Sequence, residues 1–187
     1  MHKWSGDNPS SPSLTTGTLY VNNNLEIFGK LSETADFSNA GYCVDFSRSY
    51  LCGDETGSER QLTLHARARE QLEHNIALIR PGASYREIAE GAWQVPAEHQ
   101  DSRYYCVAHG LGMSGEYPNI SHARPGQPYP IDGELEAGMV LCVESYIGCA
   151  RTRQGVKLEE QLLVTDSGIE RMSAEVPFDS RLSPAVF

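Results

Sequence analysis

Three segments decide how we interpret this chain: YYCVAHGLGMSGEYPNI (residues 104–120), LEAGMVLCVESYIG (135–148) and GVKLEEQLLVTDSG (155–168). His109 ends a run of aromatic and β-branched residues, whereas Glu144 and Glu159 each lie inside a strand-like run. A carboxylate is costly to remove from water unless a cation or strong hydrogen-bond donors replace the lost solvation. One imidazole and two carboxylates that converge from separate strands would therefore suit a divalent metal.

The second and third segments predict a β-hairpin. Its strands are expected at residues 139–147 and 156–165, joined by an eight-residue loop. In the second strand Glu159 and Glu160 belong to opposite faces, because successive side chains alternate along a strand. The alternation puts Lys157 on the face of Glu159, but it does not decide which glutamate points into a pocket.

The region before these segments is expected to supply a further strand and a further carboxylate. Residues 19–28 contain two short extended pieces separated by NNN, which predicts a turn. From residue 41 onward apolar and polar residues alternate, and Asp45 lies in the middle of the polar face. Taken alone, Asp45 is typical of the solvated face of an edge strand. Beside the three side chains above, it becomes a fourth candidate ligand.

Two helices are expected between these strands. Residues 58–80 predict an amphipathic helix that ends before a Pro-Gly pair. His65 and His74 lie among charged neighbours in this helix, so we expect both to be exposed. A shorter helix is expected over residues 84–93, where SYRE forms a capping box. A strand over residues 103–108 follows.

Composition bounds the class of protein. With 187 residues, of which 40% are hydrophobic, the chain suits one domain at 19–187 after a disordered lead at 1–18. A formal charge of −10 without a Lys/Arg cluster excludes a nucleic-acid surface. No apolar stretch reaches the length of a signal peptide core or a membrane span, so we expect no membrane partner and a cytoplasmic location. The five cysteines lack zinc-ribbon or CxxC spacing and are expected to be buried, reduced thiols.

Two alternatives to metal binding stay open on the residues alone. His109 in HGLG can be an ordinary turn residue, and Glu144 can pair with an arginine such as Arg48, because buried charges are often simply paired. The sequence contains no nucleophile elbow, phosphate loop or dinucleotide fingerprint that would indicate a different chemistry.

The order of four side chains carries a resemblance to a known superfamily. Asp45, His109 in HGLG, Glu144 after GMVLCV and Glu159 in VKLEEQ are similar to the catalytic half of the creatinase, prolidase and methionine aminopeptidase superfamily. The resemblance covers residues 41–178. It implies an α+β class and the pita-bread fold, a curved antiparallel sheet flanked by helices. It also implies that two aspartates, one histidine and two glutamates hold a pair of metal ions.

Within that superfamily, the chain most resembles the DddP-type dimethylsulfoniopropionate (DMSP) lyase branch. GYCVDFSRSYLCGD, HGLGMSGEYP, VESYIG and GVKLEEQ are similar to segments of these lyases, and the spacings between the four candidate ligands agree. The true peptidases usually carry a second histidine seven positions after the first, where this chain has Glu116. Tyr104 matches a tyrosine of the lyase substrate pocket, which implies a substrate-binding role.

The chain also departs from the lyase pattern. An Asp-x-Asp pair of the lyases aligns with Glu33 and Ala35, so one ligand is lengthened and one is missing. Asp36 could substitute only if the strand shifted by one residue, which would turn its side chain to the opposite face. The proton-abstracting aspartate of the lyases aligns with Gly115, and Glu116 is the local replacement. The separate N-terminal domain typical of the family is expected to be truncated.

The resemblance implies a metal-dependent lyase that cleaves DMSP to dimethyl sulfide and acrylate by β-elimination, with Glu116 and His109 as catalytic residues. Iron is the expected metal, with zinc and manganese as alternatives, and the second metal position is expected to be weak or empty. One alternative is an Xaa-Pro metallopeptidase similar to aminopeptidase P or prolidase, and another is a truncated, non-catalytic pita-bread domain. The expected partner is a small-molecule substrate, and the resemblance allows a homodimer. The implied metal ligands are Asp45, His109, Glu144, Glu159 and Glu33.

Overall fold

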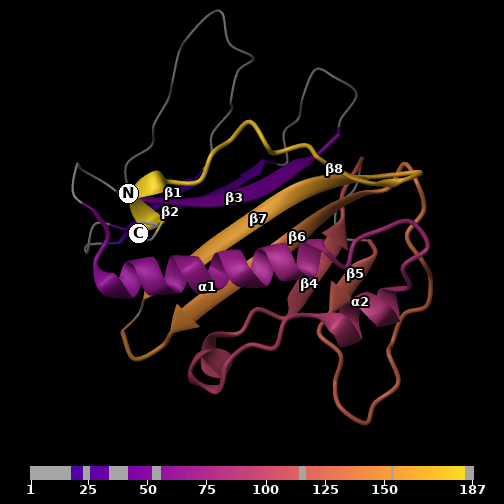
Figure 1. The fold of residues 1–187 in the computed structure, drawn as a ribbon, viewed down its shortest axis with the longest axis horizontal. Coiled ribbons are helices and arrows are strands. Elements are labelled where there is room, and N and C mark those ends of the chain that lie inside the picture. The colour runs from indigo at the N-terminus through magenta and orange to yellow at the C-terminus, as the bar shows by residue number, and fades with distance from the viewer. Residues whose placement is uncertain are drawn as a thin grey trace, which may run out of the picture.

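The chain forms one antiparallel sheet with helices packed against it (Figure 1). The computed structural model describes residues 18–22, 26–33, 42–51, 56–113, 117–152 and 154–183, and between 18 and 33 it describes the backbone. The sheet order is β1-β2-β3-β7-β6-β4-β5, and β8 pairs with β7. The strands are β1 (Thr18–Asn22), β2 (Glu26–Glu33), β3 (Val44–Leu51), β4 (Cys106–Gly110), β5 (Asn119–Ser121), β6 (Val140–Cys149), β7 (Gln154–Thr165) and β8 (Gly168–Arg171).

The N-terminal strands agree with the two extended pieces that the sequence predicts. β1 and β2 pair antiparallel, and the NNN segment between them lies outside the described residues. Of the expected disordered lead, only Thr18 is described, and it begins β1.

The β6–β7 hairpin is the longest pairing in the sheet and was predicted, but its strands extend further than expected. Pairing continues through Gly148 with Gly155 and Cys149 with Gln154, so the eight residues predicted as a loop are partly strand. The two glycines have a packing reason to be there. A Cβ atom added at Gly155 would lie 2.6 Å from the hydroxyl of Tyr146, and one at Gly148 would lie 2.8 Å from its ring. The tyrosine therefore covers a glycine pair inside the hairpin.

Both predicted helices form, and each begins at a capping box. The helix α1 (Glu59–Ile76) lies across β6 and β7 with Ser58 as its N-cap, and α2 (Tyr85–Gly91) begins after Ser84 (Figure 1). Each capping serine accepts a hydrogen bond from the third helical residue and stabilises the otherwise unpaired N–H groups there. Two 3₁₀ turns complete the helical elements, η1 (Ala97–Ser102) and η2 (Ser180–Leu182). None of the helices within the described ranges has the length and apolar character required to cross a membrane.

The prediction that both histidines of α1 are exposed is wrong for His65. His74 is exposed, whereas the side chain of His65 is buried and lies edge-on to the ring of Phe178, with 6.2 Å between ring centroids. The physical reason is helical spacing: His65 shares the buried stripe of Ala68 and Leu72, which lie three and seven positions further along. Charged sequence neighbours therefore misidentified the face of the helix to which His65 belongs.

The hydrophobic core lies between α1, α2 and one face of the sheet. On β6 the core residues are Leu141, Val143 and Ile147, and on β7 they are Val156, Leu158, Leu162 and Val164. Because side chains alternate along a strand, the intervening residues of β6 and β7 point to the opposite face of the sheet. That opposite face, which we call the open face, carries the polar residues discussed next.

Of the four cysteines that the structure describes, Cys106 and Cys142 are buried, Cys43 and Cys149 are partly exposed, and all four are free thiols. The expectation of reduced thiols holds for these four, and the expectation of burial holds for two of them.

Candidate metal centre

The strand register brings the predicted ligands onto the open face. Glu144 lies directly opposite Glu159 in the β6–β7 pairing, and Ser47 of β3 lies opposite Glu159 from the other side. Residues directly opposite each other in antiparallel strands share a face. Asp45 is two positions before Ser47 and therefore points the same way. In the β4–β6 pairing, His109 lies opposite Cys142, which is two positions before Glu144.

Three of the four predicted carboxylate ligands lie close to the imidazole of His109. His109 Nε2 lies 3.4 Å from Glu144 Oε1, 3.4 Å from Glu159 Oε1 and 3.9 Å from Asp45 Oδ2. The side chains of His109, Glu144 and Glu159 are at most 4% exposed, so the charges are removed from water. Each ligand comes from a different strand, β3, β4, β6 or β7, which no local sequence pattern could have arranged.

Hydrogen bonds to the backbone fix the strands that carry these residues. The Cys43 N–H donates to the carbonyl of Gly112 over 2.8 Å, which ties the segment after His109 to the start of β3. The Asp45 N–H donates to the side-chain carbonyl of Gln161 over 3.3 Å. The Nδ1 atom of His109 lies 3.2 Å from the carbonyl of Gly110, and this contact leaves Nε2 directed at the carboxylates.

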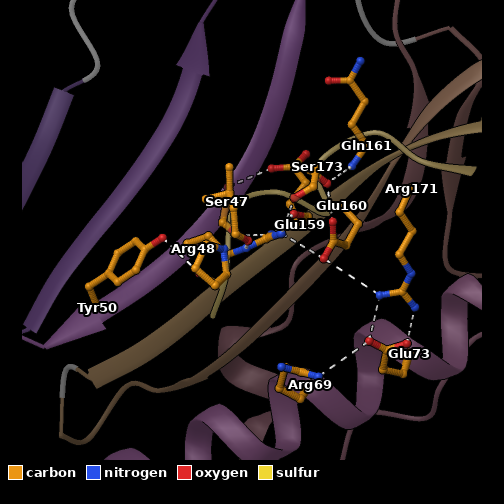
Figure 2. A network of polar contacts seen from close by, with 12 residues as sticks. Ser47, Arg48, Tyr50, Arg69, Glu73, Glu159, Glu160, Gln161, Arg171 and Ser173 are labelled. Atoms are coloured by element: carbon orange, nitrogen blue, oxygen red, sulfur yellow. Dashed lines mark hydrogen bonds and ion pairs between the residues drawn. The ribbon is translucent and has the colours of Figure 1, made fainter. Parts of the chain in front are cut away.

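The structure resolves the ambiguity between the neighbouring glutamates of β7. Glu159 points into the cluster, and Glu160 points to the helix-covered face, where it binds Arg48 at 2.9 Å (Figure 2). Arg48 also donates to the carbonyls of residues 159, 173 and 176. The alternative in which Arg48 neutralises Glu144 is therefore not realised, because this guanidinium lies on the other face of the sheet.

A lysine that sequence reasoning did not assign to the site lies inside it. The ammonium of Lys157 contacts Glu144 Oε2 and lies 3.9 Å from Glu159 Oε2. The same ammonium lies 4.6 Å from the ring centroid of Tyr104, a cation–π contact. The alternative in which Glu144 pairs with a basic side chain is thus realised, but the partner is Lys157 and not an arginine. The strand alternation already put Lys157 on the face of Glu159, and that signal could have found it.

The environment shifts the pKa values of Glu159 and His109. Burial alone raises the pKa of Glu159, but contact with His109, the charge of Lys157 and a hydrogen bond from Ser47 (2.8 Å) together lower it below its usual value. Burial lowers the pKa of His109, and the contacts with Glu159 and the Gly110 carbonyl more than offset this, so that its pKa is raised. The contact between His109 and Glu159 therefore shifts the pKa of each group in the direction that favours its charged form.

The donor set fits a divalent cation. Among the residues that the structure describes, Glu159 Oε1 is buried and has no hydrogen bond of good geometry, although His109 Nε2 lies 3.4 Å away, and such an atom is costly to bury unless a cation satisfies it. Ligand atoms of His109, Cys142 and Glu159 lie within 4.8 Å of one another, as the atoms around one ion do. Imidazole with carboxylates suits zinc, iron or manganese.

The remaining predicted residues are placed only in part. The backbone register pairs Ser32 with Asp45 and Glu33 with Val44, and the role of Glu33 as a ligand stays a prediction. Ala35, Asp36, Gly115 and the predicted catalytic Glu116 lie outside the described residues. Tyr104 is partly buried beside the cluster, with its ring tilted against that of Tyr105.

Comparison with known proteins identifies the family to which this chain belongs. The model of "Metallopeptidase family M24" matches residues 34–166, which contain all four converging side chains. The chain belongs to metallopeptidase family M24. Proteins of the M24 family depend on divalent metals, and the cluster is a possible metal site of this M24 chain.

Relatives of the M24 chain include both lyases and peptidases. It is similar to "Dimethylsulfoniopropionate lyase DddP" of Roseovarius nubinhibens, with 34% identity over 142 residues, which is 76% of this chain and 32% of the lyase. It is also similar to methionine aminopeptidase 1A of Arabidopsis thaliana, with 27% identity over 163 residues, covering 75% and 38% of the two chains. The chain thus spans about a third of the length of these curated relatives.

Solved structures of other proteins share the fold. The prolidase from Pyrococcus furiosus superposes with a TM-score of 0.63 at 22% identity, covering 87% of this chain and 42% of the prolidase. The X-Pro aminopeptidase from Thermotoga maritima superposes with a TM-score of 0.61 at 21% identity, covering 82% and 41%. The expected α+β class and pita-bread fold are confirmed, as is the resemblance to this superfamily.

Proposed function

We propose that this M24 chain is the catalytic part of a metal-dependent carbon–sulfur lyase, which cleaves DMSP to dimethyl sulfide and acrylate. The observation that carries the proposal is the position of the Lys157 ammonium between the carboxylate cluster and the ring of Tyr104. The Lys157 ammonium contacts Glu144 and also lies 4.6 Å from the ring centroid. A metal-ligand set and a cation-binding aromatic ring therefore lie within the reach of one small molecule.

DMSP carries a carboxylate at one end and a dimethylsulfonium cation at the other. The sulfonium would bind the face of Tyr104 in place of the Lys157 ammonium, because aromatic rings attract cations through their quadrupole. The carboxylate suits the cluster once a divalent cation is bound there. Both halves of the zwitterion thus have a complementary partner in the M24 chain.

Asp45, His109, Glu144 and Glu159 would hold the metal, for which we propose iron, with zinc and manganese as alternatives. When bound, the metal supplies Lewis-acid polarisation of the substrate carboxylate, which acidifies the α-proton. In the proposed reaction Glu116 accepts the α-proton, and the electron pair of the Cα–H bond forms the Cα–Cβ double bond. The Cβ–S bond breaks with its electron pair on sulfur, so neutral dimethyl sulfide leaves. Tyr104 orients the sulfonium for this departure.

Hydrolysis of Xaa-Pro peptide bonds is the second candidate. The likeness in fold to a prolidase and an X-Pro aminopeptidase favours it. The residue seven positions after His109 is Glu116 in place of the second histidine of the peptidases, which favours the lyase. The third candidate is a domain that binds metal or a partner without turnover. The pairing of Lys157 with Glu144 favours this candidate, because the ammonium gives the carboxylates a counter-ion in the absence of metal.

One assay separates these candidates. The purified chain is loaded in turn with Fe²⁺, Zn²⁺ and Mn²⁺ and supplied with DMSP or with an Xaa-Pro dipeptide. The lyase predicts dimethyl sulfide in the headspace with DMSP, lost in Glu116→Gln and kept in Glu90→Gln, which changes an exposed glutamate of α2. Release of proline from the dipeptide, without dimethyl sulfide from DMSP, would overturn the lyase proposal in favour of the peptidase. No product from either substrate at full metal loading would overturn both.

A further inference from the structure

We infer that Cys142 is a ligand of the metal in this centre, so that the site binds its cation through sulfur as well as through imidazole and carboxylate. The inference rests on the proposed metal site and adds a ligand that the predicted set does not contain. It concerns the thiol in the middle of the open face, directly opposite His109 in the β4–β6 pairing.

The position of the thiol is set by three strands. Cys142 lies between His109 on β4 and Gln161 on β7, in the row of the sheet next to the Glu144–Glu159 pair. Its side chain is fully buried. The sulfur lies 3.2 Å from the backbone carbonyl of Asp45, so it also touches the strand that carries the fourth ligand.

The distances suit shared coordination. The sulfur of Cys142, a ring nitrogen of His109 and a carboxylate oxygen of Glu159 all lie within 4.8 Å of one another. In a tetrahedral site with bonds of about 2.0–2.3 Å, ligand atoms lie about 3.5 Å apart. Side-chain shifts on the order of 1 Å would therefore bring all three atoms onto one ion.

The donor count gives Cys142 a reason to bind. The position aligned with one aspartate ligand is Ala35, which has no donor atom in its side chain. One oxygen of Glu144 is engaged by the ammonium of Lys157. A thiolate would compensate for the lost oxygen donor, and it would shift the preference of the site from manganese towards zinc, iron or cobalt, because softer ligands favour those metals.

The competing explanation is a buried thiol that binds no metal, and Cys106 provides the comparison. Cys106 is buried in the neighbouring strand β4, three positions before His109, and it is not part of the group of ligand atoms around the centre. It is therefore a matched control for burial. Cys149, at the far end of β6, is a matched control for the strand.

Cobalt substitution tests the inference with a spectroscopic readout. The full chain is freed of metal and titrated with Co²⁺, because a thiolate bound to cobalt gives a charge-transfer band in the near ultraviolet that oxygen and nitrogen ligands do not give. We expect the band in the unmodified chain, in Cys106→Ser and in Cys149→Ser, and its loss in Cys142→Ser and Cys142→Ala. We expect cobalt affinity in both Cys142 variants to fall at least about tenfold, since even loss of a residue that only orients a ligand costs about 10–100-fold.

The outcomes separate this inference from the proposals on which it rests. Stoichiometric cobalt binding without the band in the unmodified chain would overturn the sulfur ligand and leave the metal site standing. Failure to bind cobalt at all would overturn both. A band that disappears in Cys142→Ala, in a chain that makes no dimethyl sulfide, would support the sulfur ligand and count against the lyase. The unmodified chain is informative even if the Cys142 variants fail to fold.

Discussion

Glu159 and Glu160 are neighbours on β7, and comparing them separates structure from function in this protein. Glu160 lies on the helix-covered face, where Arg48 binds it at 2.9 Å and the hydroxyl of Ser173 donates to its other oxygen (Figure 2). The guanidinium is itself covered by the ring of Phe178, with 4.2 Å to the centroid. Every side-chain nitrogen of Arg48 and both carboxylate oxygens of Glu160 have a partner, either in the sheet or in the segment after β8.

Glu159 has the same residue type and similar burial but a different environment. One oxygen accepts a hydrogen bond from Ser47, while the other faces His109 without a proper donor. Two further carboxylates and one ammonium share that small volume. Burial of a glutamate is thus no mark of function. What indicates a functional site is a group of several buried charged side chains in which, within the described part of the chain, an oxygen such as Glu159 Oε1 has no hydrogen bond of good geometry.

The largest expected effect comes from breaking the buried ion pair between Glu160 and Arg48. Glu160→Gln leaves the buried guanidinium of Arg48 without a counter-charge, so we expect the free energy of unfolding in urea to fall by about 3–5 kcal/mol. Metal content should not change, because Glu160 does not face the centre. The control is Glu170→Gln, an exposed glutamate on β8. A loss below about 1 kcal/mol would show that the pair with Arg48 is not a structural requirement.

The second prediction concerns how stability depends on pH through His65, which is buried on the helix-covered side of the sheet. The pKa of His65 is lowered from 6.5 to about 4, mainly by burial and also by the charge of Arg69, although Asp179 and the Leu182 backbone partly oppose this. The folded pKa is below the unfolded one, so the unfolded chain binds more protons between these values. Stability is therefore fully present above pH 6.5 and declines as pH falls towards 4, by up to about 1.4 kcal/mol per pH unit.

Urea unfolding at several pH values between 4 and 7 measures this slope. His65→Gln should reduce it, whereas His74→Gln, in the same helix but exposed, should not. His122, whose pKa burial lowers to about 4 with a contribution from Arg103, supplies a second part of the slope that His65→Gln retains. An unchanged slope in His65→Gln would contradict the burial of a neutral imidazole beside Phe178.

A third prediction addresses the open face. Lys157→Met removes the ammonium that contacts Glu144, which leaves buried carboxylates without their cation. We expect the metal-free chain to lose about 1–3 kcal/mol, the usual cost of a buried polar group without a partner. Added Zn²⁺ should restore more stability to the variant than to the unmodified chain, as measured by thermal unfolding with and without metal. An equal loss in both conditions would mean that Lys157 and the metal do not share these carboxylates.

The smallest effect sharpens the contrast between buried and exposed ion pairs. Arg171 binds Glu73 of α1 with both terminal guanidinium nitrogens, and it also lies 3.9 Å from Glu160 (Figure 2). The Glu73 side chain is 41% exposed, so solvent screens the pair. Glu73→Gln should therefore cost less than about 1 kcal/mol in urea unfolding. A loss as large as that of Glu160→Gln would show that exposure does not separate the two glutamates.

Local patterns predicted much of this molecule correctly. The capping box at Ser84, the helix across the sheet and the hairpin all follow from interactions within a few residues of each other. The errors have different causes. His65 was assigned to solvent because its charged neighbours were weighed above its helical spacing from Ala68 and Leu72. Gly148 and Gly155 were assigned to a loop, whereas the strand pairing continues through both and Tyr146 packs over them.

The sequence by itself determined the alternation of β7 and the spacing of the four candidate ligands, because both are properties of one extended chain. Only the tertiary structure decided that Glu159 faces the centre, that Arg48 neutralises Glu160 and that Lys157 enters the cluster. These choices depend on which face of the sheet α1 covers and on the register between β3, β6 and β7. Both are set by contacts between residues that lie far apart in the sequence.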